Sequence, residues 1–126
     1  MKLIITDSIR ETEFQSLQKI FSLEIVKVAA RKAMVGLGEN IKNSSKIPAT
    51  CLEKLYLTSS GGSGRIIFLL RIEAEKSVLV MIRMKNDKQI GANMTVKNPK
   101  FKRVLDRNLD LILSDLENAH FEEYEL

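Results

Sequence analysis

The sequence predicts an α+β fold: an N-terminal strand and two helices, a three-stranded antiparallel continuation of the sheet, and a C-terminal helix. The chain has 126 residues, enough for one hydrophobic core, so we expect a single domain over residues 1–126. Apolar residues recur at helical spacing near both ends of the chain. Between them, the runs 66–70 and 78–82 are continuously apolar, which is typical of strands covered on both faces.

The N-terminal part of the chain carries the patterns of one strand and two helices. Residues 2–6 alternate weakly and predict the first strand. A helix is expected from Thr12, and a second one from Leu23, because apolar residues then recur at helical spacing until glycines stop the pattern. Residues 39–50 are polar and are expected to form a loop.

Three strands are expected in the middle of the chain. The first covers residues 54–58 and is followed by a turn of serine and glycine over residues 59–64. The next two cover residues 65–74 and 77–85, joined by a tight turn at Glu75-Lys76. The turn after the first strand is expected to be a plain hairpin connection, because the Gly-Lys-Ser/Thr ending of a phosphate-binding loop is missing.

The last helix begins with a clear signal at Asn98-Pro99, where asparagine can cap and proline fits the first turn. Its apolar face extends to about Asn118. Cations line its first half and carboxylates its second half, which is the reverse of the order that the helix dipole favours. Residues 119–126 are expected to form an acidic tail, either solvated or folded over the basic surface.

Charge is distributed unevenly along the chain, whose formal net charge is +4. Residues 1–53 carry +2, residues 54–107 carry +8, and residues 108–126 carry −6. The middle block, residues 54–107, is therefore a candidate surface for a polyanion such as RNA.

Composition excludes several classes of site. The lone Cys51 excludes an intramolecular disulfide and a cysteine-based zinc site, and we expect it to be a packed thiol. The middle block has few carboxylates and no histidine, so we expect no metal and no cofactor. No apolar run approaches the about 20 residues that span a bilayer, and the N-terminus does not fit a signal peptide. We expect a cytoplasmic protein without a membrane partner.

Basic residues gather where the two central strands end. Arg65 opens one strand, while Arg83, Lys85 and Lys88 lie at and beyond the end of the next one. With a turn at Glu75-Lys76, Arg65 should lie opposite residues 84–86 and therefore close to Lys85. The sequence predicts that Arg65, Arg83 and Lys85 share one exposed surface of the sheet.

These features resemble the RelE/ParE superfamily of bacterial toxins, in particular its RelE/HigB-like members. The likeness covers residues 54–118 and rests on Gly62-Ser63-Gly64-Arg65-Ile66-Ile67-Phe68 and on the strand that ends in Lys85-Asn86-Asp87-Lys88. The resemblance implies a toxin of a type II toxin–antitoxin system, silenced by a cognate antitoxin protein. RelE-like members cleave mRNA on the ribosome without metal, so the resemblance implies a ribosome-dependent mRNA endoribonuclease that inhibits translation.

The same resemblance implies the site residues. Arg65, Arg83, Lys85 and Lys88 match the family's catalytic cations, and Lys54 matches a basic residue leading into the second strand. We expect Lys54, Arg71, Lys97 and Lys100 to bind RNA. The segment after Lys88 departs from the family pattern, because residues 89–94 contain no tyrosine or histidine; Tyr56, His120 and Tyr124 are the remaining candidates for the proton acceptor.

Two other interpretations stay open. A ParE-like toxin of the same fold acts on DNA gyrase and is not a nuclease, which would explain the missing tyrosine or histidine. An inactive basic RNA-binding module would need exposed aromatic residues for base stacking, and the predicted strands offer only Tyr56 and Phe68.

Overall fold

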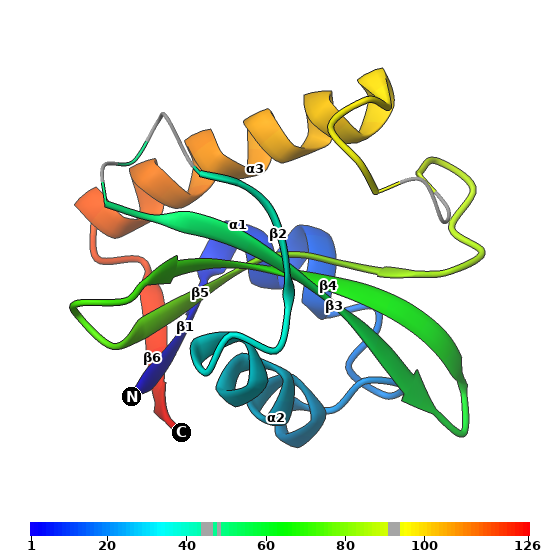
Figure 1. Ribbon diagram of the computed structural model, residues 1–126, viewed down its shortest axis with the longest axis horizontal. Helices are drawn as coiled ribbons and strands as arrows, with labels where there is room; N and C mark the ends of the chain where they lie inside the picture. The colour runs from blue at the N-terminus through cyan, green and yellow to red at the C-terminus, as the bar shows by residue number, and fades with distance from the viewer. Residues whose placement is uncertain (44–46, 48, 91–93) are drawn as a thin grey trace.

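The computed structural model describes residues 1–43, 47, 49–90 and 94–126. Six strands form one mixed sheet in the order β2-β3-β4-β5-β1-β6 (Figure 1). β1 pairs in parallel with β5, whereas the other neighbouring strands are antiparallel. The strands are β1 (Lys2–Thr6), β2 (Glu39–Asn43), β3 (Cys51–Ser59), β4 (Gly62–Arg71), β5 (Lys76–Met84) and β6 (Phe121–Glu125).

Helices cover both faces of this sheet, with α3 above it and α2 below it in Figure 1. The α+β class is confirmed, but the predicted layout is wrong in detail. The first helix begins at Asp7 rather than Thr12, and it consists of a short α-helical turn and a π-helical turn. The helical elements are α1 (Asp7–Ile9), η1 (Arg10–Phe14), α2 (Leu23–Met34) and α3 (Pro99–Glu117).

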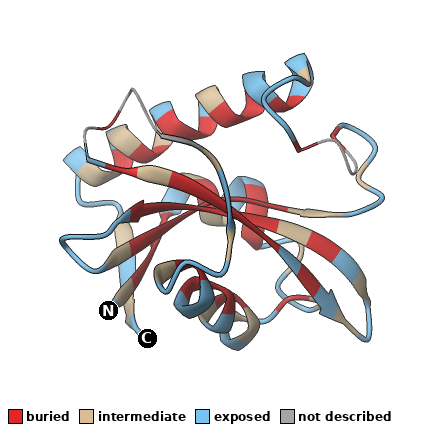
Figure 2. Ribbon diagram, viewed as in Figure 1, coloured by how far each residue is buried: buried red, intermediate tan, exposed pale blue. Residues whose placement is uncertain are grey.

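The core lies between the sheet and the two longer helices (Figure 2). β4 and β5 are buried along most of their length, as their continuous apolar runs predicted. The N-terminus of α3 is capped as predicted, since the Asn98 side chain accepts a hydrogen bond from the Lys100 N–H at 3.1 Å. The buried Asn108 side chain donates to the Val80 carbonyl at 2.9 Å, which ties α3 to β5. No helix in the described ranges is long and apolar enough to cross a membrane.

The β4–β5 hairpin has a different register from the expected one. Residues 72–75 form the turn, with Glu75 in the left-handed region at φ 52°, and β5 already begins at Lys76. The register also shifts by one residue between Ile67 and Phe68. As a result, Arg65 lies opposite Arg83 and not opposite residues 84–86.

Part of the expected loop over residues 39–50 is a strand. β2 pairs with β3, with Glu39 opposite Lys54 and Asn43 opposite Cys51. Residues 44–46 and 48 of that expected loop lie outside the described residues. The polar composition of β2 is compatible with its position, because an edge strand is exposed on one side.

The expected acidic tail is wrong for residues 121–125, which form the edge strand β6 against β1. Its carboxylates are partners of cations on the same sheet. Lys2 Nζ lies 3.2 Å from a carboxylate oxygen of Glu123 and 3.6 Å from one of Glu125. Lys76 Nζ lies 3.6 Å from the other carboxylate oxygen of Glu123. The backbone pairing with β1 attaches β6 to the sheet and these exposed ion pairs add to it, so removal of residues 119–126 would remove part of the sheet rather than a loose tail.

We expect the attachment of β6 to weaken in acid. Hydrogen bonding to Lys2 and the nearby charge of Lys76 lower the pKa of Glu123 below its ordinary value of 4.5. A carboxylate whose pKa is lowered by folding stabilises the folded state at pH values above its ordinary pKa. This stabilisation is lost as the pH falls through the lowered pKa. Amide hydrogen exchange in β6, relative to that in β4, should therefore accelerate below about pH 4.5. In a Glu123→Gln variant the β6 amides should exchange faster than in the wild type at neutral pH as well. Equal exchange rates in the variant and the wild type would contradict the expectation.

Candidate nucleic-acid interface

Three neighbouring strands bring a tyrosine and two arginines into one row. Tyr56 on β3 lies opposite Arg65 on β4, which lies opposite Arg83 on β5. Directly opposed residues share a face of a sheet, so the three side chains leave the sheet on the same side. The next row, Leu57, Gly64 and Met84, points to the other face, where a Cβ on Gly64 would lie 2.7 Å from the Phe21 ring.

Arg65 and Lys54 flank the ring of Tyr56. The guanidinium carbon of Arg65 lies 4.5 Å from the ring centroid, and Lys54 Nζ lies 5.8 Å from it. Tyr56 is 62% exposed, so its ring and hydroxyl face solvent. We call these three residues the Tyr56 platform.

Lys54 is part of the platform but is not a free surface cation. It is only 6% exposed, and its Nζ donates to the Met94 carbonyl at 3.3 Å and lies 3.7 Å from a carboxylate oxygen of Glu39. Lys54 therefore connects β3 to the segment before α3 and contributes positive charge from below the surface. Arg65 has no carboxylate within ion-pair distance among the described residues, so its charge is available to a ligand.

Arg83 is already engaged by acidic residues. Its Nε donates to one oxygen of Glu13 at 2.9 Å and its Nη2 to the other at 2.7 Å, a bidentate pair in which the Glu13 side chain is 0% exposed. Glu13 reaches it from the π-helical turn η1 and also accepts the Ile82 N–H at 3.1 Å. The hydrogen bond to Glu13 raises the pKa of Arg83 above its ordinary value. Arg83 thus ties η1 to β5, and its guanidinium is not available to a phosphate in this state.

The segment after β5 is held by the same arginine. Arg83 Nη1 donates to Gln89 at 3.0 Å and lies 3.4 Å from Asp87. Asp87 in turn accepts the N–H groups of Gln89 and Ile90, at 3.1 and 2.9 Å. Within this braced segment Lys85 and Lys88 are exposed and carry no ion pair among the described residues.

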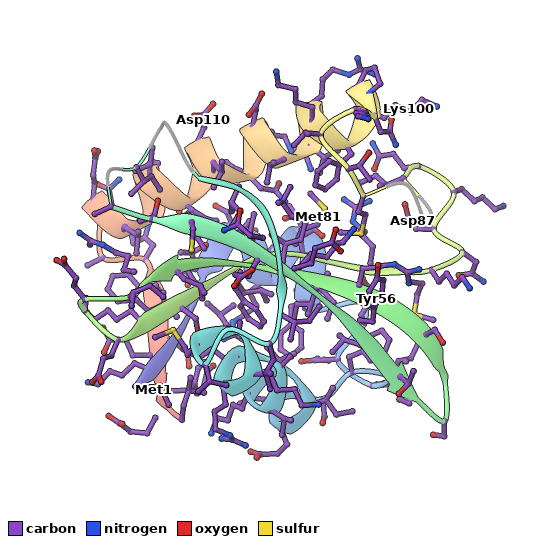
Figure 3. All side chains as sticks on the ribbon, viewed as in Figure 1. Met1, Tyr56, Met81, Asp87, Lys100 and Asp110 are labelled. Atoms are coloured by element: carbon purple, nitrogen blue, oxygen red, sulfur yellow. The ribbon has the colours of Figure 1, made fainter. Side chains whose placement is uncertain are left out.

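The other predicted RNA-binding residues lie apart from the platform. Arg71 is at the opposite end of β4, about 20 Å from Arg65 along an extended strand of six residues. Lys97 and Lys100 are exposed at the start of α3. Figure 3 shows Tyr56, Asp87 and Lys100 toward the same end of the view. The structure thus brings together Lys54, Arg65 and Arg83, with Lys85 two residues further along the chain, and leaves Arg71 out.

The candidates for a proton acceptor are separated by the fold. Tyr124 lies in β6, where its hydroxyl accepts a hydrogen bond from Arg10 and donates to Glu122 at 3.1 Å. Partial burial is the main cause that raises the pKa of Tyr124. His120 immediately precedes β6. Tyr56 is the one of the three that shares a surface with Arg65, whereas residues 91–93 of the segment after Lys88 lie outside the described residues.

Other chemistry finds little support in the described residues. Cys51 is half-buried; burial and then the charge of Glu53 raise the pKa of its thiol, which disfavours the nucleophilic thiolate. Histidine, cysteine and acidic residues of the described ranges form no group of three or more that could hold a metal ion. The sequence matches no protein-family model and no curated protein.

Proposed function

We propose that this protein is the toxin of a type II toxin–antitoxin system, a ribosome-dependent mRNA endoribonuclease that inhibits translation. The observation that carries the proposal is the Tyr56 platform: an exposed phenol on a sheet, stacked on an arginine that no described carboxylate neutralises. A phosphate of single-stranded RNA can meet the guanidinium there, while the Tyr56 oxygen can donate a proton as a phenol or accept one as a phenolate.

The chemistry would use the RNA's own 2′-hydroxyl as nucleophile. Its oxygen attacks the adjacent phosphorus, and the bond from phosphorus to the 5′-oxygen breaks, leaving a cyclic phosphate and a free 5′-hydroxyl. In its phenolate form Tyr56 is placed to accept the proton of the 2′-hydroxyl and become a phenol, and Arg65 is placed to stabilise the negative phosphoryl oxygens. The leaving 5′-oxygen needs a proton, which Lys85 or Lys88 can supply from the braced segment.

The engagement of Arg83 supports a dependence on the ribosome. With Arg83 bound to Glu13, Arg65 is the one arginine of the row that a phosphate can reach, so the site alone has few groups to orient RNA. Correct positioning of two reacting groups is worth many orders of magnitude in rate. A ribosome that holds the mRNA strand in place would provide that positioning.

Expression of the chain alone tests this proposal. We expect growth arrest with cleavage of mRNA inside translated regions, detected by primer extension on a transcript and on a matched transcript without a start codon. Arrest with intact mRNA and inhibited gyrase would instead identify a gyrase-directed toxin. Absence of arrest would favour an RNA-binding module, for which the exposed Tyr56 ring offers a stacking surface.

The proposal includes a cognate antitoxin as partner. Val28 in the middle of α2, and Val35 and Leu37 just after its end, are exposed apolar residues, with 42%, 66% and 69% of their surface accessible. A groove of about 330 Å³ between α2 and β3 includes Val28 and reaches Tyr56. Exposed apolar surface next to a charged site favours a protein partner that covers both. If the neighbouring reading frame encodes such a partner, its co-expression should suppress the growth arrest.

A further inference from the structure

A second basic surface lies on the first half of α3. Gln89, Lys100, Arg103, Val104 and Arg107 line a groove of about 390 Å³. Lys100, Arg103 and Arg107 are exposed, and none of them has an ion pair with a carboxylate among the described residues. We call these five residues the α3 groove.

The cations of the α3 groove gain no stabilisation from the helix dipole, because none of them lies in the last turn of α3. α3 has no acidic residue in its first turn and no basic residue in its last turn, although the helix dipole favours the opposite distribution. Lys100 lies in the first turn, where the dipole disfavours a cation, whereas Arg103 and Arg107 lie beyond the turn over which the dipole acts. Exposed cations without a carboxylate partner among the described residues leave their charge available to an anionic ligand.

The composition of the groove indicates which form of RNA it suits. Besides the three cations it has an amide and a small apolar side chain, and none of the described residues that line it is aromatic. Single-stranded RNA is typically bound by stacking its bases on aromatic rings, whereas duplex RNA hides its bases and presents its backbone. The Tyr56 platform therefore suits a single strand, and the α3 groove suits the backbone of a duplex.

The spacing of the cations fits successive phosphates along a strand. Positions 100, 103 and 107 follow the i, i+3, i+7 pattern and therefore share one face of the helix. They extend over about 10 Å along its axis, at 1.5 Å per residue. Phosphates of one strand recur every few ångströms along a duplex, so three side chains on this face can contact neighbouring phosphates.

The α3 groove and the Tyr56 platform are connected through one residue. Gln89 lines the groove and accepts a hydrogen bond from Arg83 at 3.0 Å, and Arg83 lies opposite Arg65 in the sheet. We propose that the α3 groove binds the phosphate backbone of an RNA duplex while the adjacent platform takes a single strand. This inference rests on the proposed function in taking RNA as the ligand, and it names a second form of RNA at a second site.

Binding of two RNA probes to purified protein tests the inference. The probes are a duplex of about 16 base pairs, and an unstructured oligouridine, each measured by fluorescence anisotropy at several salt concentrations. The test variant is Lys100→Glu with Arg103→Glu. The matched control is Lys19→Glu with Arg31→Glu, which changes net charge equally at exposed positions outside both sites. Circular dichroism verifies that both variants are folded.

We expect the α3 variant to bind the duplex at least about tenfold more weakly, because two charged contacts to phosphates are lost. The plot of log association constant against log salt concentration should become less steep, with the magnitude of its slope reduced by about two, one per lost phosphate contact. Binding of oligouridine should change no more than in the control variant. Tyr56→Ala should show the reverse pattern, with weaker oligouridine binding and unchanged duplex binding.

Several results would overturn the inference: no duplex binding by the wild type, equal losses in the α3 and control variants, or a parallel loss of both probes. A further measurement with ribosomes that carry no mRNA identifies the source of the duplex. Weaker ribosome binding by the α3 variant than by the control indicates ribosomal RNA, whereas equal binding restricts the groove to duplex in the mRNA. Duplex binding without RNA cleavage would contradict the proposed function and leave the α3 groove established.

Discussion

Replacing Arg65 with alanine should lower the rate of RNA cleavage by about 10²–10³-fold, the typical loss when one donor aimed at developing charge is removed. Arg65 is half-exposed and stacks on Tyr56 without an ion pair among the described residues, so its loss should leave the fold stable. Growth assays and single-turnover cleavage on programmed ribosomes measure the effect.

The matched control for this variant is Arg71→Ala. Arg71 is an exposed arginine on the same strand, at the end that lies away from the platform. Cleavage should be unchanged in the control. Equal activity of both variants and the wild type would contradict a role for Arg65 at the scissile phosphate.

Tyr56→Phe separates the two uses of the platform. Loss of the hydroxyl removes the acceptor for the 2′-hydroxyl proton, and general base catalysis is typically worth about 10²–10⁴-fold. The ring remains, so RNA binding by stacking should persist. If the Tyr56→Phe variant lost both RNA binding and cleavage, the result would indicate that the hydroxyl acts in binding.

Replacing Arg83 with alanine should have its main effect on stability. The substitution leaves the Glu13 carboxylate buried without its partner, and removal of one member of a buried ion pair typically costs about 3–5 kcal/mol. Urea denaturation followed by circular dichroism gives the free energy of unfolding. Relief of growth arrest by this variant would then report unfolding as much as catalysis, whereas Arg65→Ala reports catalysis.

A double substitution is the control for the Arg83 prediction. Combining Arg83→Met with Glu13→Gln removes both charges, and the protein should be more stable than Arg83→Ala alone because no unpaired buried charge remains. If Arg83→Ala unfolds at the same urea concentration as the wild type, the ion pair does not stabilise the fold.

The sequence was sufficient to name most residues of the candidate site, but neither their register nor the state of the arginines. Arg65 and Arg83 lie on one face because the register shift between Ile67 and Phe68 places them opposite each other; without that shift Arg65 would lie opposite Ile82, whose side chain points to the other face. The partner of Arg83 was not predictable, since Glu13 is 70 positions away and looks like any acidic residue on a helix. The sequence also did not show that Tyr56 is the central residue of the candidate site. Its neighbours Lys54 and Arg65 come from two strands, and only their register shows that they flank the ring.

The fold could be predicted where local signals are strong. The Asn98 cap and the apolar stripe after it fix α3, because both are properties of contiguous residues. β6 was missed because glutamates make up most of it and resemble a solvated end; their partners Lys2 and Lys76 lie far away in the chain. Edge strands depend on such distant contacts more than on their own propensity.

The place of β1 in the sheet has a consequence for synthesis on the ribosome. β1 is made first, yet it lies between β5 and β6, with Lys2 opposite both Lys76 and Glu125. Pairing between segments so far apart in the chain makes folding slow, because the ends of a long loop must first meet. The hairpin of β3 and β4, which carries the Tyr56 platform, is complete before β5 has been synthesised. A nascent chain therefore contains the residues of the Tyr56 platform before it contains β5 and β6, and we expect its sheet to be complete only after β6 has been synthesised.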